Sequence, residues 1–265
     1  LFDPNAIAVI GASADLSRIS GQPIVALKGA GFKKPIYLVN PKYTELHDLK
    51  CYPSAAAIGQ PVDLALIAVP ARGVADAIRD CGKAGIPFAI VLTAGFREGG
   101  PEGRKLEDDL LRAARESNVR VIGPNCQGAL SVPSRMWCVF GSVSQETALR
   151  EGPVSCAFQS GGFGYAVVNM AEAQGLGFRH VVSTGNETDI TMPELMSEFL
   201  DDPGTKLAFA YMEGTPNARS LLDLGRKSLA TGKPVFIWKG AQTESGTKAA
   251  ASHTGCRLSS SRSRP

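Results

Sequence analysis

His253 lies in the stretch AASHTG (250–255), among small residues and close to a basic, serine-rich end of the sequence. A neutral imidazole is a nucleophile near pH 7, and neighbours this small would leave its ring accessible. A plain surface histidine would fit the same composition. The other two histidines are His47, in a polar loop, and His180, at the start of a strand-like run; both are expected to be structural or exposed.

A second candidate site is the segment QSGGFG (159–164), which links an apolar run to a helix-like one. Ser160 suits a helix N-cap, and Gly161 and Gly162 would let an anion approach the free backbone N–H groups behind it. A capped helix without a ligand is the alternative. The segment is not the nucleophile elbow of serine hydrolases, because GxSxG requires a glycine where Phe158 stands.

The third candidate is the turn Gly11, Ala12 and Ser13, which follows the first apolar run. Such a turn can present backbone N–H groups and a helix N-terminus to a phosphate. The GxGxxG spacing of NAD sites is missing, which leaves a tight turn without a ligand or a site for another phosphate-bearing nucleotide. Later apolar runs also end in turn residues, and one long ligand could cross them all: VNPK (39–42), AVPARG (68–73), TAGFREGG (93–100) and GPNCQG (123–128).

Two rounds of strand and helix patterns must position these candidates. Continuous apolar runs separated by amphipathic helices indicate parallel sheets covered on both faces. We therefore predict an α/β protein with a Rossmann-like domain over 1–130, a flavodoxin-like domain over 131–256 and a disordered tail over 257–265. The predicted strands are 7–11, 36–41, 64–70, 88–95 and 119–125, then 154–159, 180–185, 207–213 and 235–240; the helices of the second round are 161–174, 192–200 and 217–230.

Composition narrows the class of protein. The 265 residues are 44% hydrophobic and carry a net charge of +3, too weak and too dispersed to indicate nucleic-acid binding. We find neither a membrane-length apolar run nor a secretory signal. None of the six cysteines forms a CxxC pair, so we expect reduced thiols, no metal site and a cytoplasmic location.

Nine short motifs occur along the chain in a fixed order: GAS, VNPK, AVPA, TAGF, GPNCQG, QSGGFG, TGNETD, YMEG and AASHTG. Together they resemble the CoA-binding and phosphohistidine portion of the NDP-forming acyl-CoA synthetases, relatives of the succinyl-CoA synthetase α subunit. The resemblance runs from Phe2 to Gly255. It implies a Rossmann-like CoA-binding domain followed by a flavodoxin-like domain of the succinyl-CoA synthetase type.

The resemblance also implies roles for single residues. His253 matches the histidine that is phosphorylated during turnover, and Glu213 matches the glutamate that orients it. Ser160, Gly161 and Gly162 match the helix N-terminus that holds the phosphoryl group. The positions that would bind CoA are Gly11, Ala12, Ser13, Asn40, Pro41, Lys42, Val69, Pro70, Asn125 and Cys126, with the last two toward the reacting thiol.

The implied activity joins a small carboxylic acid to CoA, through a phosphohistidine and an acyl phosphate, while NTP becomes NDP and phosphate. An ATP-grasp β subunit or domain would supply ATP/ADP or GTP/GDP and Mg, and an oligomer is expected. The sequence departs from the family after Gly255, where CRLSSSRSRP replaces the usual small residues and helix, and no ATP-grasp segment is recognised.

Two other interpretations stay open. A CoA-binding regulatory module would keep the fold without catalysis, but it would need neither Glu213 nor His253. An NAD-dependent oxidoreductase is disfavoured by the missing GxGxxG, and also because the second strand ends at Asn40 rather than at a ribose-binding acidic residue.

Overall fold

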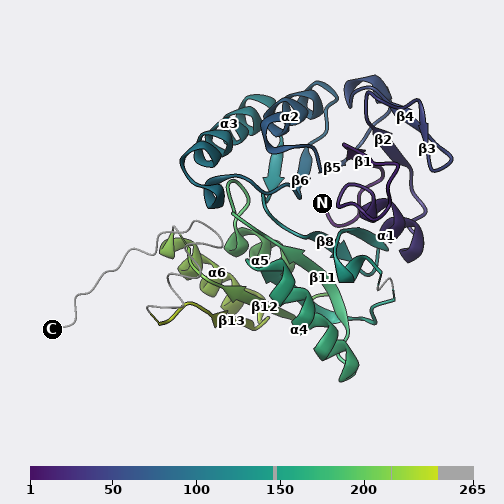
Figure 1. The fold of residues 1–265 in the computed structure, drawn as a ribbon. Helices are drawn as coiled ribbons and strands as arrows, with labels where there is room; N and C mark the ends of the chain where they lie inside the picture. The colour runs from purple at the N-terminus through teal and green to yellow at the C-terminus, as the bar shows by residue number, and fades with distance from the viewer. Residues whose placement is uncertain (146–147, 216, 244–265) are drawn as a thin grey trace.

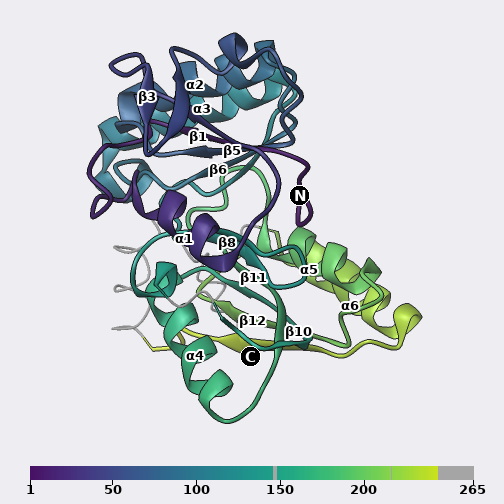
Figure 2. The same cartoon turned by 90° about the vertical axis from the view of Figure 1, so that its right-hand side faces the viewer.

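Residues 1–145, 148–215 and 217–243 are described by the structure, a computed structural model. Two sheets dominate it, the first in the purple-to-teal half of the chain and the second in the green-to-yellow half (Figure 1). Helices lie against both sheets (Figure 2). The predicted α/β class, with two successive sheet domains, is confirmed. Within the described ranges no helix is both long and apolar enough to cross a bilayer.

The first sheet has the strand order β3-β4-β2-β1-β5-β6-β7. All its neighbours pair in parallel except β3 and β4, a short hairpin that the sequence patterns did not reveal. Its strands are β1 (Ile7–Ile10), β2 (Ile36–Val39), β3 (Glu45–Leu46), β4 (Leu49–Tyr52), β5 (Leu64–Ile67), β6 (Phe88–Val91) and β7 (Arg120–Ile122), and its helices are α1 (Gln22–Ala30), α2 (Val74–Lys83) and α3 (Pro101–Ser117), with single 3₁₀ turns η1 (Ala56–Ile58), η2 (Ala71–Gly73) and η3 (Arg97–Gly99).

The second sheet has the order β13-β12-β10-β11-β8-β9. Its parallel strands β11-β10-β12-β13 follow the 2-1-3-4 sequence of a flavodoxin-like sheet. Its strands are β8 (Gly128–Ser131), β9 (Met136–Val139), β10 (Glu151–Phe158), β11 (Phe178–Ser183), β12 (Leu207–Met212) and β13 (Val235–Lys239), and its helices are α4 (Gly161–Ala173), α5 (Met192–Asp201) and α6 (Ala218–Thr231), with the 3₁₀ turn η4 (Ser142–Ser144).

The hairpin β8–β9 corrects one expectation. No strand was predicted between residues 125 and 154, yet two form there: β8 pairs antiparallel with β11, and β9 pairs antiparallel with β8, so the second sheet gains two strands. The predicted domain boundary at residue 130 falls inside β8. The β8 sequence, GALS, has only two apolar residues, and Pro133 follows it closely, so the segment resembles a turn more than a strand.

Burial explains why the central strands appear in the sequence as unbroken apolar runs. All four residues of β1 (IAVI) and of β5 (LALI) are buried. Helices cover the two faces of a parallel sheet, so neither face of its inner strands meets water. At the carboxyl end of each strand this cover stops, and the turns are left to meet a ligand.

The two domains pack against each other as well as following one another in the chain. Helix α1 of the first domain packs against β9 of the second, and Gln22 Oε1 accepts a hydrogen bond of 2.7 Å from the Gly141 backbone N–H. One hydrophobic cluster combines Leu66 and Ile90 of the first sheet with Ala129 of the second. This shared core fixes the strand ends of the two sheets relative to each other.

The described cysteines are structural. Cys51, Cys81, Cys126, Cys138 and Cys156 are all free and buried. Burial raises the pKa of the Cys81 and Cys126 thiols to about 12. Thiols held protonated in this way pack as small apolar groups and are poor nucleophiles.

Candidate functional site

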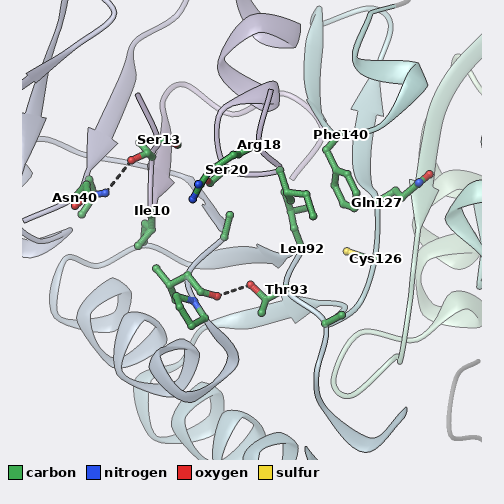
Figure 3. Close-up of a pocket in the computed structure, with 18 of the residues that line it drawn as sticks. Ile10, Ser13, Arg18, Ser20, Asn40, Leu92, Thr93, Cys126, Gln127 and Phe140 are labelled. Atoms are coloured by element: carbon green, nitrogen blue, oxygen red, sulfur yellow. Dashed lines mark hydrogen bonds between the residues drawn. The ribbon is translucent and has the colours of Figure 1, made fainter. Parts of the chain in front are cut away.

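A cavity of about 1170 Å³ lies at the carboxyl ends of the first sheet and reaches the second domain (Figure 3). Its walls include Gln159, Gly161 and Gly162 of the second domain. Every residue predicted to bind CoA also lines it: Gly11, Ala12, Ser13, Asn40, Pro41, Lys42, Val69, Pro70, Asn125 and Cys126. The structure therefore brings together turns that are spread over more than half of the sequence.

The turn after β1 is held by backbone contacts. The N–H groups of Gly11 and Ala12 donate to the Val39 carbonyl at 2.8 and 3.3 Å, and Asn40 Nδ2 donates to the Ala12 carbonyl at 2.9 Å. Gly11 has φ +87°, and a Cβ on it would lie 2.9 Å from the Ala68 carbonyl oxygen. Only glycine fits there without strain.

A loop follows this turn where a helix N-terminus was expected. Helix α1 begins only at Gln22, and Ser17, Arg18 and Ser20 from the intervening loop line the cavity. Ser13 Oγ accepts a hydrogen bond of 3.0 Å from the Asp15 N–H, which starts the loop. The polar groups at this end of the cavity therefore come from a loop.

Positive charge gathers at this end of the cavity. Lys42 was predicted, and its backbone N–H donates to Asn40 Oδ1 at 3.0 Å. Arg18 was missed, because only the fold brings its loop beside the strand ends. The Arg18 guanidinium lies 3.4 Å from Asp15 and is 74% exposed, so it can turn toward an anion at little cost.

The middle of the cavity is largely apolar. Ile10, Leu92 and Phe140 line it, and the hydroxyl of Thr93 donates to the Val69 carbonyl at 2.6 Å, a bond drawn dashed in Figure 3. Sequence reasoning missed Phe140, because it follows β9, in a stretch where no strand was predicted. A cavity with a charged, polar end and an apolar middle suits a long ligand with phosphates at one end.

Asn125 and Cys126 lie where the cavity approaches the second domain. Asn125 has φ +56°, its N–H donates to the Thr93 carbonyl at 2.9 Å, and its Nδ2 donates to Asn186 Oδ1 at 3.3 Å. The Cys126 thiol donates to the Val91 carbonyl at 3.3 Å. With its raised pKa, Cys126 is a wall residue and not a reacting thiolate.

The predicted phosphoryl-binding turn opens helix α4 directly. Ser160 occupies the N-cap position with an extended backbone, although its side chain makes no capping hydrogen bond. Gly161 and Gly162 follow on the cavity wall. A Cβ on Gly161 would lie 2.8 Å from both Gln127 Cβ and Ser183 Oγ, whereas one on Gly162 would meet nothing within 4 Å. An anion could reach the first N–H groups of this helix from the cavity.

Glu213 stands directly after β12 and is buried, with 7% of its surface exposed. Its backbone N–H donates to Gln159 Oε1 at 2.6 Å, and its carbonyl accepts from Lys239 Nζ at 2.7 Å. Glu213 and Ser160 are not among the cavity-lining residues. His253 lies outside the described residues.

Comparison with known proteins identifies both halves. The family described as "CoA binding domain" matches residues 5–131, and the family described as "Succinyl-CoA ligase like flavodoxin domain" matches residues 151–263. The chain has the domain pair of the NDP-forming acyl-CoA synthetase α portion. The resemblance inferred from the ordered motifs is thereby confirmed.

Curated relatives of this α portion are ligases. The ADP-forming acetate–CoA ligase I of Archaeoglobus fulgidus is 38% identical over 255 residues, covering 96% of this chain and 36% of the relative. The α subunit of ADP-forming acetate–CoA ligase I of Pyrococcus furiosus is 36% identical over 259 residues, covering 96% of this chain and 55% of the subunit. This α portion thus spans between about a third and about a half of these relatives.

A solved structure is similar throughout. The acetyl-coenzyme A synthetase 1 of Ca. Korarchaeum cryptofilum, in complex with phosphate and ADP, is 40% identical with a TM-score of 0.89. The match covers 98% of this chain and 55% of that one.

Proposed function

We propose that this α portion acts in an NDP-forming acyl-CoA synthetase. The first domain, up to β7, binds CoA, and the second domain, from β8 onward, carries the phosphohistidine at His253. The phosphoryl group passes from the nucleotide to His253 and from there to a carboxylate, and the CoA thiol then displaces phosphate from the acyl phosphate to give the thioester.

The cavity that joins the two domains carries this proposal. It runs from the Gly11 turn, with Lys42 and Arg18 at the phosphate end, to Gly161 and Gly162 at the N-terminus of α4. CoA laid along it would have its phosphates near the cations and its thiol toward the second domain. Helix N–H groups at Gly161 and Gly162 would stabilise the charge of a phosphoryl group brought there.

A partner supplies the nucleotide step. We propose an ATP-grasp β subunit or domain that binds ATP/ADP or GTP/GDP with Mg, in an oligomeric assembly located in the cytoplasm. Support comes from the relatives, one of which is named an α subunit and all of which are longer than the matched region. Acetate is the first acid to test, because these relatives are named acetate–CoA ligases.

Calorimetric titration of the purified chain with CoA, and separately with NAD, tests the first domain. Saturable CoA binding without NAD binding is expected. NAD binding without CoA binding would overturn the synthetase assignment in favour of an oxidoreductase. Lys42→Ala is expected to weaken CoA binding by roughly tenfold, through the loss of one phosphate contact.

The second domain is tested by incubating the chain with acetyl-CoA and radiolabelled inorganic phosphate. Acid-labile, base-stable label on the protein is expected, as phosphohistidine, with release of CoA and acetate. His253→Ala should abolish the label while leaving CoA affinity unchanged. Label that persists in His253→Ala, or wild type that binds CoA but takes up no label, would contradict the proposed relay.

A further inference from the structure

Gln159, the last residue before Ser160, has a buried side-chain amide with every hydrogen-bonding position in use. Its Oε1 accepts from the backbone N–H groups of Glu213 at 2.6 Å and of Gly214 at 3.0 Å. Its Nε2 donates to the Gly214 carbonyl at 2.6 Å and to Glu187 Oε1 at 3.0 Å. The amide therefore joins the end of β10 to the turn after β12.

Glu187 holds this amide from the other side. It belongs to the loop after β11, is 8% exposed and has φ +54°. Its Oε1 accepts from Gln159 Nε2 and, at 2.7 Å, from Thr184 Oγ1. Burying a carboxylate costs free energy, which the two donors offset only in part, and the left-handed backbone adds strain. Only the surrounding structure can maintain such an arrangement.

The neighbours of Glu187 tie the same loop to the first domain. Asn186 Nδ2 donates to Glu98 Oε2 at 2.6 Å and to Glu107 Oε2 at 3.1 Å. Glu98 Oε1 in turn accepts from the N–H groups of Gly95 and Phe96, at 2.7 and 3.0 Å. This turn directly follows Thr93 and Ala94, which line the cavity.

A continuous set of short contacts therefore runs from the cavity wall of the first domain to Glu213. It passes through Glu98, the loop 186–187 and Gln159, which itself lines the cavity. Gln159 is the only member seen to touch both the cavity and the Glu213 backbone in the described part of the chain.

We propose that Gln159, itself held by Glu187, is a positioning residue: it holds Glu213 at the correct distance from the N-terminus of α4 for phosphoryl transfer. This inference rests on the proposed function. Because its amide is fully engaged within the protein, Gln159 acts by fixing the Glu213–Gly214 backbone on the strand next to its own. A shift of Glu213 by a fraction of an ångström would misplace the carboxylate that orients the histidine.

Three variants test this role. In Gln159→Leu the Glu213 and Gly214 N–H groups lose their acceptor. In Gln159→Glu the new carboxylate faces Glu187 Oε1 and the Gly214 carbonyl, so acceptors meet acceptors. In the double variant Gln159→Glu/Glu187→Gln the two side chains are swapped, so that the amide of residue 187 can donate to the carboxylate of residue 159.

The measurements are phosphohistidine yield and rate from acetyl-CoA and labelled phosphate, CoA affinity by calorimetry, and hydrogen exchange at Glu213 and Gly214. The first two variants should lower the labelling rate by at least about tenfold, with CoA affinity within about twofold of wild type. Exchange at Glu213 and Gly214 should speed up. The double variant Gln159→Glu/Glu187→Gln should recover part of the rate, because it restores the contact between residues 159 and 187 but leaves the Gly214 carbonyl without its donor. The exposed control Gln174→Leu should behave as wild type.

The outcomes separate the two proposals. Wild type that forms no phosphohistidine overturns the proposed function and the positioning role with it. Wild-type labelling that survives in Gln159→Leu overturns the positioning role alone. If labelling and CoA affinity fell together, and the double variant rescued neither, the positioning role would also be overturned, because that pattern reports a general loss of structure.

Discussion

The first parallel strand of each sheet, β1 and β10, ends in a turn rich in small residues, but the two turns are built in opposite ways. After β1, Gly11 and Ala12 are held by backbone bonds to Val39, and residues 11–21 form a loop before α1, which starts at Gln22. After β10, α4 begins at once at Gly161, and the turn rests on the buried side chains of Gln159 and Glu187. The first turn thus offers an adaptable loop for a long ligand, and the second a rigid helix end for a compact charge.

Substitution at the first turn has the largest expected effect. In Gly11→Ala the methyl group would lie 2.9 Å from the Ala68 carbonyl, on a residue with φ +87°. Backbone strain and steric overlap should together lower stability by about 3 kcal/mol and weaken CoA binding by roughly 30-fold. Thermal unfolding and calorimetric titration check this. An unchanged CoA affinity would mean that the ligand does not use this turn.

At the second turn, a methyl group should lower phosphohistidine formation when added at Gly161 and have little effect when added at Gly162. In Gly161→Ala the methyl group would lie 2.8 Å from Gln127 Cβ and Ser183 Oγ, while in Gly162→Ala it has open space. We expect phosphohistidine formation to fall about tenfold in the first variant and less than about threefold in the second. Both should keep wild-type CoA affinity. Equal losses in the two variants would show that the helix end tolerates no side chain at all.

The second turn rests on a buried carboxyl, that of Glu187 in the loop after β11, which gives it a pH dependence of its own. Burial raises the pKa of Glu187, although bonds from Thr184 and Gln159 oppose the shift. The folded state therefore binds this proton more tightly than the unfolded state. The resulting stabilisation is fully present below the unfolded pKa and is lost as the pH rises through the raised folded pKa.

Glu187→Gln keeps an acceptor for Thr184 and Gln159 but removes the titration. The difference in unfolding free energy between wild type and variant should fall with rising pH across this window, starting near pH 4. Chemical denaturation at several pH values measures it. A difference independent of pH would mean that Glu187 has an ordinary pKa in the folded protein.

The sequence predicts the turn after β1 better than the side-chain contacts that support the turn after β10. Fully buried strands such as β1 and β5 and the turns that follow them are predictable, because apolar runs and small turn residues are local signals. Phe140 and Arg18 escape, since only the packing of the β8–β9 hairpin and of the α1 loop brings them to the cavity. The contacts of Gln159 are harder still to predict, because its partners Glu187 and Glu213 are 28 and 54 residues away in sequence.

The smallest expected effect provides the baseline for these comparisons. Gly225 lies inside α6 and belongs to neither turn, and a Cβ on it would meet nothing within 4 Å. Gly225→Ala should raise stability by about 0.5–1 kcal/mol, because alanine loses less backbone freedom on folding than glycine does in a helix. Thermal unfolding should show this gain, with CoA binding and phosphohistidine formation unchanged. If Gly225→Ala instead lost activity, the losses in Gly11→Ala and Gly161→Ala could no longer be ascribed to their turns, because a methyl group remote from both would act in the same way.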